Sequence, residues 1–147
     1  MELSLKDLTV NPTGLDKETF LKDWIWLMVE PMLPILVTAM GDVFAQGQSG
    51  TVYFVDTSGG AIEKVSANSN ELKELLKDQE FIEKYFLPGI IVEMRKRDIH
   101  LDPGECYTYI QSVALEGESD NIENMEVADV VDHVSLLGRM YEELFEL

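Results

Sequence analysis

Residues 51–66 constrain the fold of this chain more than any other segment. Two runs of alternating apolar and polar residues, Thr51–Thr57 and Ala61–Ser66, flank the short segment Ser58-Gly59-Gly60. Alternation with a period of two is typical of β-strands. Glycine reaches positive φ without a steric penalty, and Asp and Ser side chains can bond the local backbone, so the joining residues suit a tight turn. The pattern therefore predicts a β-hairpin.

Other runs are predicted to extend this hairpin into one antiparallel sheet. The run Pro34–Ala45 precedes the hairpin and is predicted to be a third strand that forms a meander with it, with Gln46–Gly50 as the connecting loop. Later in the chain, Glu105–Val113 alternates like a strand. Met125–Val134 is interpreted either as a strand or as a strand that passes into a helix.

Apolar residues at helical spacing occur between and after these strands. The predicted helices are Asp16 to about Val29, Asn70–Lys77, Gln79–Phe86, Ile90–Arg97 and Ser135–Phe145. Helices and an antiparallel sheet in one chain indicate an α+β fold, and we expect the helices to pack on one side of the sheet. The 147 residues suit a single domain, 1–147, in which residues 1–15 form an N-terminal extension.

The composition points to a water-soluble protein of the cytoplasm. The chain has no run of 18 apolar residues, so we expect no membrane-spanning helix. The N-terminal MELSLKDL has neither the basic nor the apolar region of a secretory signal. A single cysteine, Cys106, cannot form an internal disulfide and fits a reducing compartment.

Negative charge is the unusual feature of the composition. The chain has 28 acidic and 11 basic residues, a net charge of −17, which argues against nucleic acid as a partner. Residues 116–147 hold ten of the acids and only one base, Arg139. Such a surplus gives either a solvated acidic surface or a surface that attracts a basic protein.

Candidate catalytic groups are few. The two histidines, His100 and His133, lie far apart in the sequence and lack the companion ligands of a metal site. No phosphate-binding loop is present, so we predict no cofactor, no metal and no enzymatic activity. Cys106 is interpreted as a small buried hydrophobe, although a nucleophilic pair with either histidine is a formal alternative.

Five blocks of the sequence, taken in order, resemble a known family. They are Gly41-Asp-Val-Phe44, Gly50-Thr-Val-Tyr-Phe-Val-Asp56, Gly59-Gly60 with the strand after it, Leu101-Asp-Pro-Gly-Glu-Cys-Tyr107, and Leu115-Glu-Gly-Glu118 through Asn124 to Gly138. Their order and spacing are similar to the C-terminal domain of immunity proteins paired with type VI secretion DNase effectors, the domain that follows a GAD-like segment. The family usually has Leu-Gly-Gly-Glu where this chain has Leu115-Glu-Gly-Glu118, a difference that adds a charge.

The resemblance implies a bacterial immunity protein that binds a cognate basic effector and neutralises it. A nuclease presents a cationic surface to DNA, and an acidic partner can occupy that surface. The dense carboxylates near the C-terminus are therefore predicted to line one partner-binding surface: Glu116, Glu118, Asp120, Glu123, Glu126, Asp129 and Asp132.

A small-molecule-binding or sensory module is the alternative function. Its pocket would lie between the sheet and the helices and would be lined by Tyr53, Phe54, Tyr107 and Tyr109. The same four aromatic residues also fit ordinary core packing.

Overall fold

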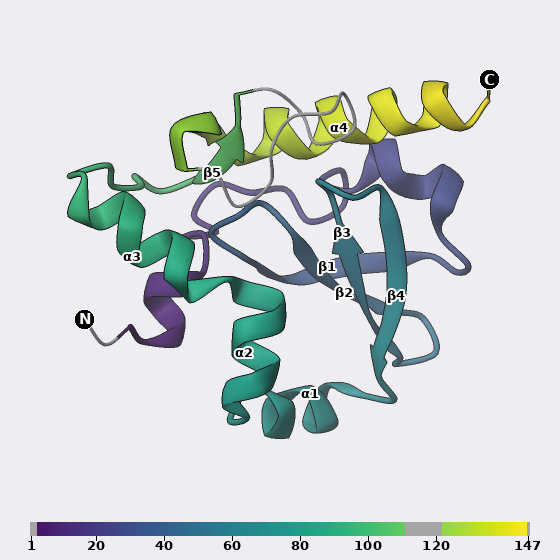
Figure 1. Ribbon diagram of the computed structural model, residues 1–147. Coiled ribbons are helices and arrows are strands. Elements are labelled where there is room, and N and C mark those ends of the chain that lie inside the picture. Colours follow the sequence, from purple (N-terminus) through teal and green to yellow (C-terminus); the bar gives the residue numbers. More distant parts are fainter. Residues whose placement is uncertain (1–2, 111–121, 147) are drawn as a thin grey trace.

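A four-stranded antiparallel sheet forms the centre of the computed structural model, which describes residues 3–110 and 122–146 (Figure 1). Its strands are adjacent in chain order: β1 (Met32–Val37), β2 (Val43–Gly47), β3 (Val52–Asp56) and β4 (Ala61–Ser66). The predicted hairpin is β3–β4, and its second strand has the predicted bounds. At the turn, Asp56 accepts a hydrogen bond from the Gly59 backbone, and Gly60 has φ of 69°.

The run Pro34–Ala45 is two strands, so predicting one strand there was wrong. A turn at residues 38–42 separates β1 from β2, and Gly41 in this turn has φ of 81°, a conformation that favours glycine. Thr38 closes the turn because its Oγ1 accepts hydrogen bonds from the backbone of Met40 and Asp42. The apolar residues on both sides conceal this turn in the sequence.

The two later strands form a sheet of their own rather than joining the meander, which corrects the prediction of a single sheet. β5 (Glu105–Tyr109) pairs with β6 (Met125–Asp129), and this hairpin meets the β1–β2 turn through a hydrogen bond from Tyr107 N to Ala39 O. The predicted extension of β5 to Val113 reaches beyond the described residues. Met125–Val134 does pass from a strand into a helix, as the second interpretation expected.

Seven helices are described in residues 3–110 and 122–146. They are the 3-10 helices η1 (Leu5–Leu8), η2 (Lys22–Leu27) and η4 (Ile122–Asn124), and the α-helices α1 (Ser69–Leu75), α2 (Gln79–Phe86), α3 (Pro88–Lys96) and α4 (Val130–Phe145). α2 has the predicted bounds, and α4 begins five residues earlier than the predicted Ser135 because Asp129 caps it. In the described part of the chain, no helix is long and apolar enough to cross a membrane.

The segment predicted as a helix from Asp16 to Val29 is a series of turns that ends in η2. Two features favour the tighter 3-10 geometry. Tryptophan and isoleucine at 24–26 are weak α-helix formers, and both indoles bond to α4, while Trp26 also donates to the Asp23 carbonyl within η2 at 2.8 Å. Trp24 donates to the Val134 carbonyl at 2.8 Å, and Trp26 reaches the Gly138 carbonyl at 3.2 Å. Tertiary contacts with α4 therefore override the helical spacing.

Both faces of the meander are covered, which corrects the expectation of helices on one side. Alternate residues of the central strands point in opposite directions, so Val43 and Val55 pack with η2 and α4, while Phe44 and Phe54 pack with α1, α2 and α3. Figure 1 shows α4 along one side of the sheet and α1 and α2 on the other. The α+β class and the antiparallel meander are confirmed.

Helix α4 sits very close to its neighbours because glycine occupies the contact points. A Cβ built on Gly138 would lie 2.5 Å from the backbone oxygen of Asp23 in η2. A Cβ on Gly60 would meet the Tyr141 ring at 2.5 Å, and one on Gly41 would meet the His133 ring at 2.5 Å. We call these three contacts the α4 seat. Real Cβ atoms are not found this near to other heavy atoms, so the seat requires glycine at all three positions.

Replacing a seat glycine in α4 should destabilise the protein. For Gly138→Ala we expect a loss of about 1–3 kcal/mol in the free energy of unfolding, because the clash is with backbone and forces α4 away from η2. Gly89→Ala in α3 is the matched control, since a Cβ there meets nothing within 4 Å. It should raise stability by about 0.5 kcal/mol through the unfolded chain. Urea denaturation of both variants measures the two changes in the free energy of unfolding. Equal changes would refute the close approach of α4 to η2 at Gly138.

Candidate functional site

The acidic residues predicted as a binding surface lie partly outside the described residues. Glu116, Glu118 and Asp120 fall in residues 111–121, and the structure describes the other four. Glu123 in η4 is exposed and forms an ion pair at 2.6 Å with Arg97, the C-cap residue of α3. Glu126, Asp129 and Asp132 follow on β6 and at the start of α4, and all three are exposed.

Asp129 has a structural role as the N-cap of α4. Its Oδ2 accepts a hydrogen bond from the Asp132 backbone N–H at 2.9 Å, which satisfies a donor that the helix itself cannot pair. The carboxylate also lies at the positive end of the helix dipole, where negative charge is favourable. Sequence reasoning treated Asp129 only as a binding residue, yet its position before an apolar helical run is an N-cap signal.

Glu126 and Asp132 lie on the same surface hollow, which we call the hairpin groove. This open groove of about 740 Å³ runs between the β5–β6 hairpin and α4. Its lining is Thr108, Tyr109, Ile110, Glu126, Ala128, Asp132, His133, Leu136, Leu137, Arg139, Met140 and Glu143. Three carboxylates and one guanidinium give the groove a negative surplus. The structure therefore places two of the predicted acidic residues together, around aliphatic side chains that sequence reasoning did not select.

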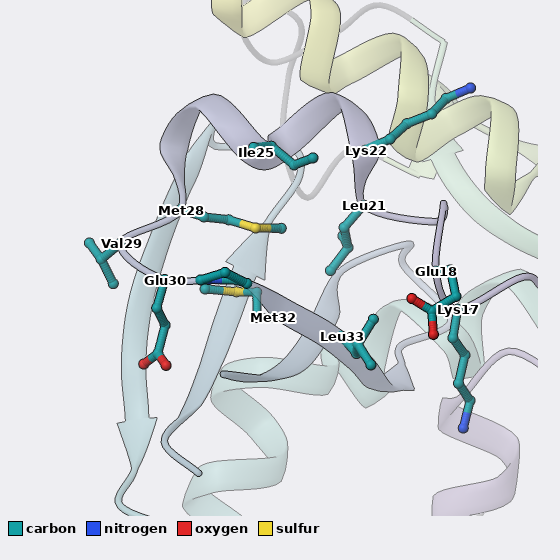
Figure 2. A pocket seen from close by; sticks show the side chains of 11 residues that line it. Lys17, Glu18, Leu21, Lys22, Ile25, Met28, Val29, Glu30, Met32 and Leu33 are labelled. Atoms are coloured by element: carbon teal, nitrogen blue, oxygen red, sulfur yellow. The ribbon is translucent and has the colours of Figure 1, made fainter. Parts of the chain in front are cut away.

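A second hollow of about 510 Å³, the β1 groove, lies between η2 and the edge strand β1 (Figure 2). Leu21, Met28 and Met32 point toward its middle, and the Lys22 ammonium group points away. Lys17 and Glu18 also line it, so charges of both signs occur at its border. Sequence reasoning missed this groove, although the exposed Ile25 and Val29 that line it lie in a conspicuously apolar run.

One acid of the β1 groove is held firmly by its neighbours. Glu30 accepts hydrogen bonds from the Tyr53 hydroxyl at 2.6 Å and from the backbone and side chain of Ser49. These hydrogen bonds hold the pKa of the Glu30 carboxyl below its usual range, and the bond from Tyr53 has the largest effect. Its carboxylate thus joins the loop after β2 to the start of β1, a structural role.

A cluster of polar groups is buried where α4 meets the β1–β2 turn. Thr57 Oγ1 lies 3.0 Å from an Asp42 carboxylate oxygen and 3.2 Å from His133 Nε2. The Thr57 backbone N–H also donates to Asp42 at 2.9 Å. Cys106 Sγ and the His133 ring both face Gly41, so the thiol belongs to the same cluster. Sequence reasoning selected His133 and Cys106 as candidates. It noted Asp42 only as part of a family block and did not select Thr57, although both are polar residues inside apolar runs.

Burial sets the ionisation of this cluster. Desolvation, followed by repulsion from Asp56, raises the pKa of the Asp42 carboxyl to about 7. Desolvation lowers the pKa of His133 to about 4 and raises the pKa of the Cys106 thiol. A nucleophilic cysteine needs an accessible thiolate, whereas Cys106 is fully buried. The structure therefore brings Cys106 and His133 together in an environment that disfavours a thiolate.

The other candidate histidine is at the surface. His100 Nε2 lies 2.8 Å from an Asp98 carboxylate oxygen, and both side chains are largely exposed. Among residues 3–110 and 122–146, no three His, Cys, Asp or Glu side chains are arranged to hold a metal ion.

The four aromatic residues proposed to line a ligand pocket lie in different parts of the structure. Phe54 packs against Phe44 and Tyr85, and Tyr107 is buried with its hydroxyl donating to the Ile99 carbonyl. Tyr53 belongs to the opposite face of the sheet, and Tyr109 borders the hairpin groove. Phe54 and Tyr107 are packed in the core, as the alternative of ordinary core packing expected. The four side chains do not converge on one cavity.

Comparison with known proteins places the chain in a family. The family described as T6SS immunity protein Tdi1, C-terminal, matches residues 66–141, which run from the end of β4 into α4. The chain belongs to this family of type VI secretion immunity proteins, and membership supports an immunity role. The resemblance found in the sequence is thus confirmed, and its blocks before residue 66 lie outside the matched range.

One solved structure shares the fold. The crystal structure of Atu4351 from Agrobacterium tumefaciens is similar with a TM-score of 0.62 and 14% sequence identity. The similarity covers 89% of this chain, which spans 65% of the length of that protein. No curated protein matches the chain significantly.

The buried cluster makes two opposing contributions to the pH dependence of stability. Folded His133 stays neutral while unfolded His133 binds a proton, so its contribution is lost as the pH falls from about 6.5 to about 4. Folded Asp42 keeps a proton that the unfolded chain releases, so its contribution is lost as the pH rises from 3.8 to about 7. The two effects offset one another across nearly the same range.

Substituting His133 or Asp42 should therefore expose the contribution of the other residue to the pH dependence of stability. Relative to the wild type, His133→Gln should lose less stability on acidification and Asp42→Asn should lose more, each by about 1–3 kcal/mol between about pH 7 and pH 4.5. Other carboxylates are common to all three proteins and cancel in the difference. Urea denaturation across this range measures how the free energy of unfolding changes with pH. If both substitutions changed this pH dependence in the same direction, the opposed contributions of His133 and Asp42 would be contradicted.

Proposed function

We propose that this chain neutralises a cognate nuclease-type antibacterial effector by binding it through its C-terminal acidic surface, without catalysis. The observation that carries the proposal is the gathering of exposed carboxylates on β6 and the start of α4, inside the segment that matches the immunity family. Glu126, Asp129 and Asp132 are the described members of this surface.

The mechanism follows from the chemistry of a nuclease. An enzyme that binds DNA presents Lys and Arg to phosphates, so a rigid array of carboxylates can occupy the same groups. The net charge of −17 makes nucleic acid an unfavourable partner for this chain and speeds encounter with a cationic protein. α4 is held by its seat, so Asp132 is presented on a fixed helix and less side-chain and backbone freedom is lost on binding.

We further propose that residues 1–147 act as one domain. The family match begins at residue 66, yet the matched α4 packs on unmatched strands β2 and β3 in one shared core. We expect the protein to act in the cytoplasm, because a nuclease effector must be stopped where the DNA lies.

Inhibition of a defined effector tests the function. We expect a toxin gene beside the gene of this chain, and its toxin domain, purified and assayed for DNA cleavage, is the probe. We expect cleavage to fall to background at one equivalent of this protein, and co-expression to protect cells. A complex that forms while cleavage continues would contradict neutralisation, and a toxin domain that does not act on DNA would contradict the nuclease class.

Charge reversal tests the acidic surface. For Glu126→Lys with Asp132→Lys we expect an association rate about tenfold or more lower, and a shallower dependence of that rate on salt, because attractive charges are replaced by repulsive ones. Asp129 is left intact because it caps α4. Stopped-flow measurements at several salt concentrations give both quantities.

Glu80→Lys with Glu83→Lys provides a control of equal charge change. These two residues lie on α2, across the sheet from α4, and Glu80 occupies the first turn of its helix as Asp132 does. The control should slow association only slightly, through net charge. Equal slowing in both double variants would show that total charge, rather than this surface, drives association.

A further inference from the structure

We propose that the hairpin groove receives an apolar side chain from a basic segment of the cognate effector, with Ile110 and Leu136 as the anchors. The inference rests on the proposed immunity function and specifies how the partner binds. It assigns different tasks to the aliphatic residues of the groove and to the carboxylates around them.

Two large aliphatic side chains lie unusually exposed in this groove. Ile110 and Leu136 are each 60% exposed, and both line the same hollow. Met140, one helical turn after Leu136, extends the apolar surface along α4. Single exposed aliphatics are common on proteins, but several around one hollow favour contact with another molecule. Covering them would remove apolar area from water, which is the main source of binding free energy.

The floor of the groove is already fixed before a partner arrives. His133 and Leu137 line it and are buried, and His133 is bonded to Thr57 in the cluster beneath α4. A partner therefore meets a formed surface and loses little free energy in ordering it.

Charge decides which kind of partner fits. Glu126, Asp132 and Glu143 border the groove, and Arg139 is the single base in its described lining. A segment with Lys or Arg beside an apolar residue would satisfy both the carboxylates and the aliphatic floor. An acidic segment would be repelled, and an uncharged apolar ligand would leave the carboxylates partly desolvated without partners.

The β1 groove lacks this selectivity. Lys17 and Lys22 balance Glu18 and Glu30 in its lining, and the Glu30 carboxylate is already bonded to Tyr53 and Ser49 (Figure 2). Its surface gives no electrostatic preference for a cationic effector. It provides a comparison site of similar exposure on the same molecule.

The aliphatic residues and the carboxylates of the hairpin groove should affect different rate constants of binding. Buried aliphatic anchors hold a complex together and so affect dissociation, whereas charges at the border act during approach and so affect association. We expect Leu136→Asp to raise the dissociation rate from the inactivated toxin domain encoded beside this gene by about tenfold or more. Its association rate should change much less.

Ile25→Asp is the matched control. Ile25 is 64% exposed and lines the β1 groove, so the substitution adds the same charge at a site of similar exposure. It should leave both rates near the wild-type values. Circular dichroism checks that both variants fold.

Methyl NMR of the wild-type chain gives a readout that needs no substitution. On titration with the same toxin domain, the Ile110, Leu136 and Met140 methyl signals should shift, and those of Ile25 and Val29 should stay. Binding with an unaltered Leu136→Asp dissociation rate, or with shifts confined to the β1 groove, overturns the groove assignment and spares the immunity proposal. Failure of the wild type to bind the toxin domain overturns both.

Discussion

The close seating of α4 on the sheet is the contact on which the rest of the structure depends. Gly41, Gly60 and Gly138 each leave space for a ring or a backbone atom that a Cβ would exclude. Through this contact the helix closes one core, covers the buried Asp42 cluster and forms one wall of the hairpin groove. Tyr141 adds a hydrogen bond from its hydroxyl to the Ser58 carbonyl, so the helix is also tied to the β3–β4 turn.

The inward and outward sides of α4 have different roles. Its inward side carries His133 and Gly138, which lie close to Gly41 and to η2. Its outward side carries Asp132, Leu136 and Glu143, which face the groove. The inward side therefore holds the helix in its seat, while the proposed choice of partner depends on the outward side.

Local features of the fold could be predicted from the sequence, and long-range ones could not. The β3–β4 turn and helix α2 depend on nearby residues, so their patterns were sufficient. The 3-10 form of η2 depends on indole bonds to residues more than 100 positions away, and the burial of Asp42 depends on Thr57 and α4. The surplus of acidic residues near the C-terminus could be read from the composition. Only the fold shows that Glu126 and Asp132 share a groove with exposed aliphatic side chains. Asp129 combines a helix cap with a surface charge, and the cap signal, its position before an apolar helical run, was passed over in favour of the charge.

The position of the two indoles has an optical consequence. Trp24 and Trp26 are the only tryptophans in the chain; they stack with centroids 6.2 Å apart and both donate to carbonyls of α4. Tryptophan emission from this protein therefore reports on the contact between η2 and α4, and loosening of α1 to α3 on the far side of the sheet would change it very little. Fluorescence and circular dichroism would then follow different parts of the same molecule.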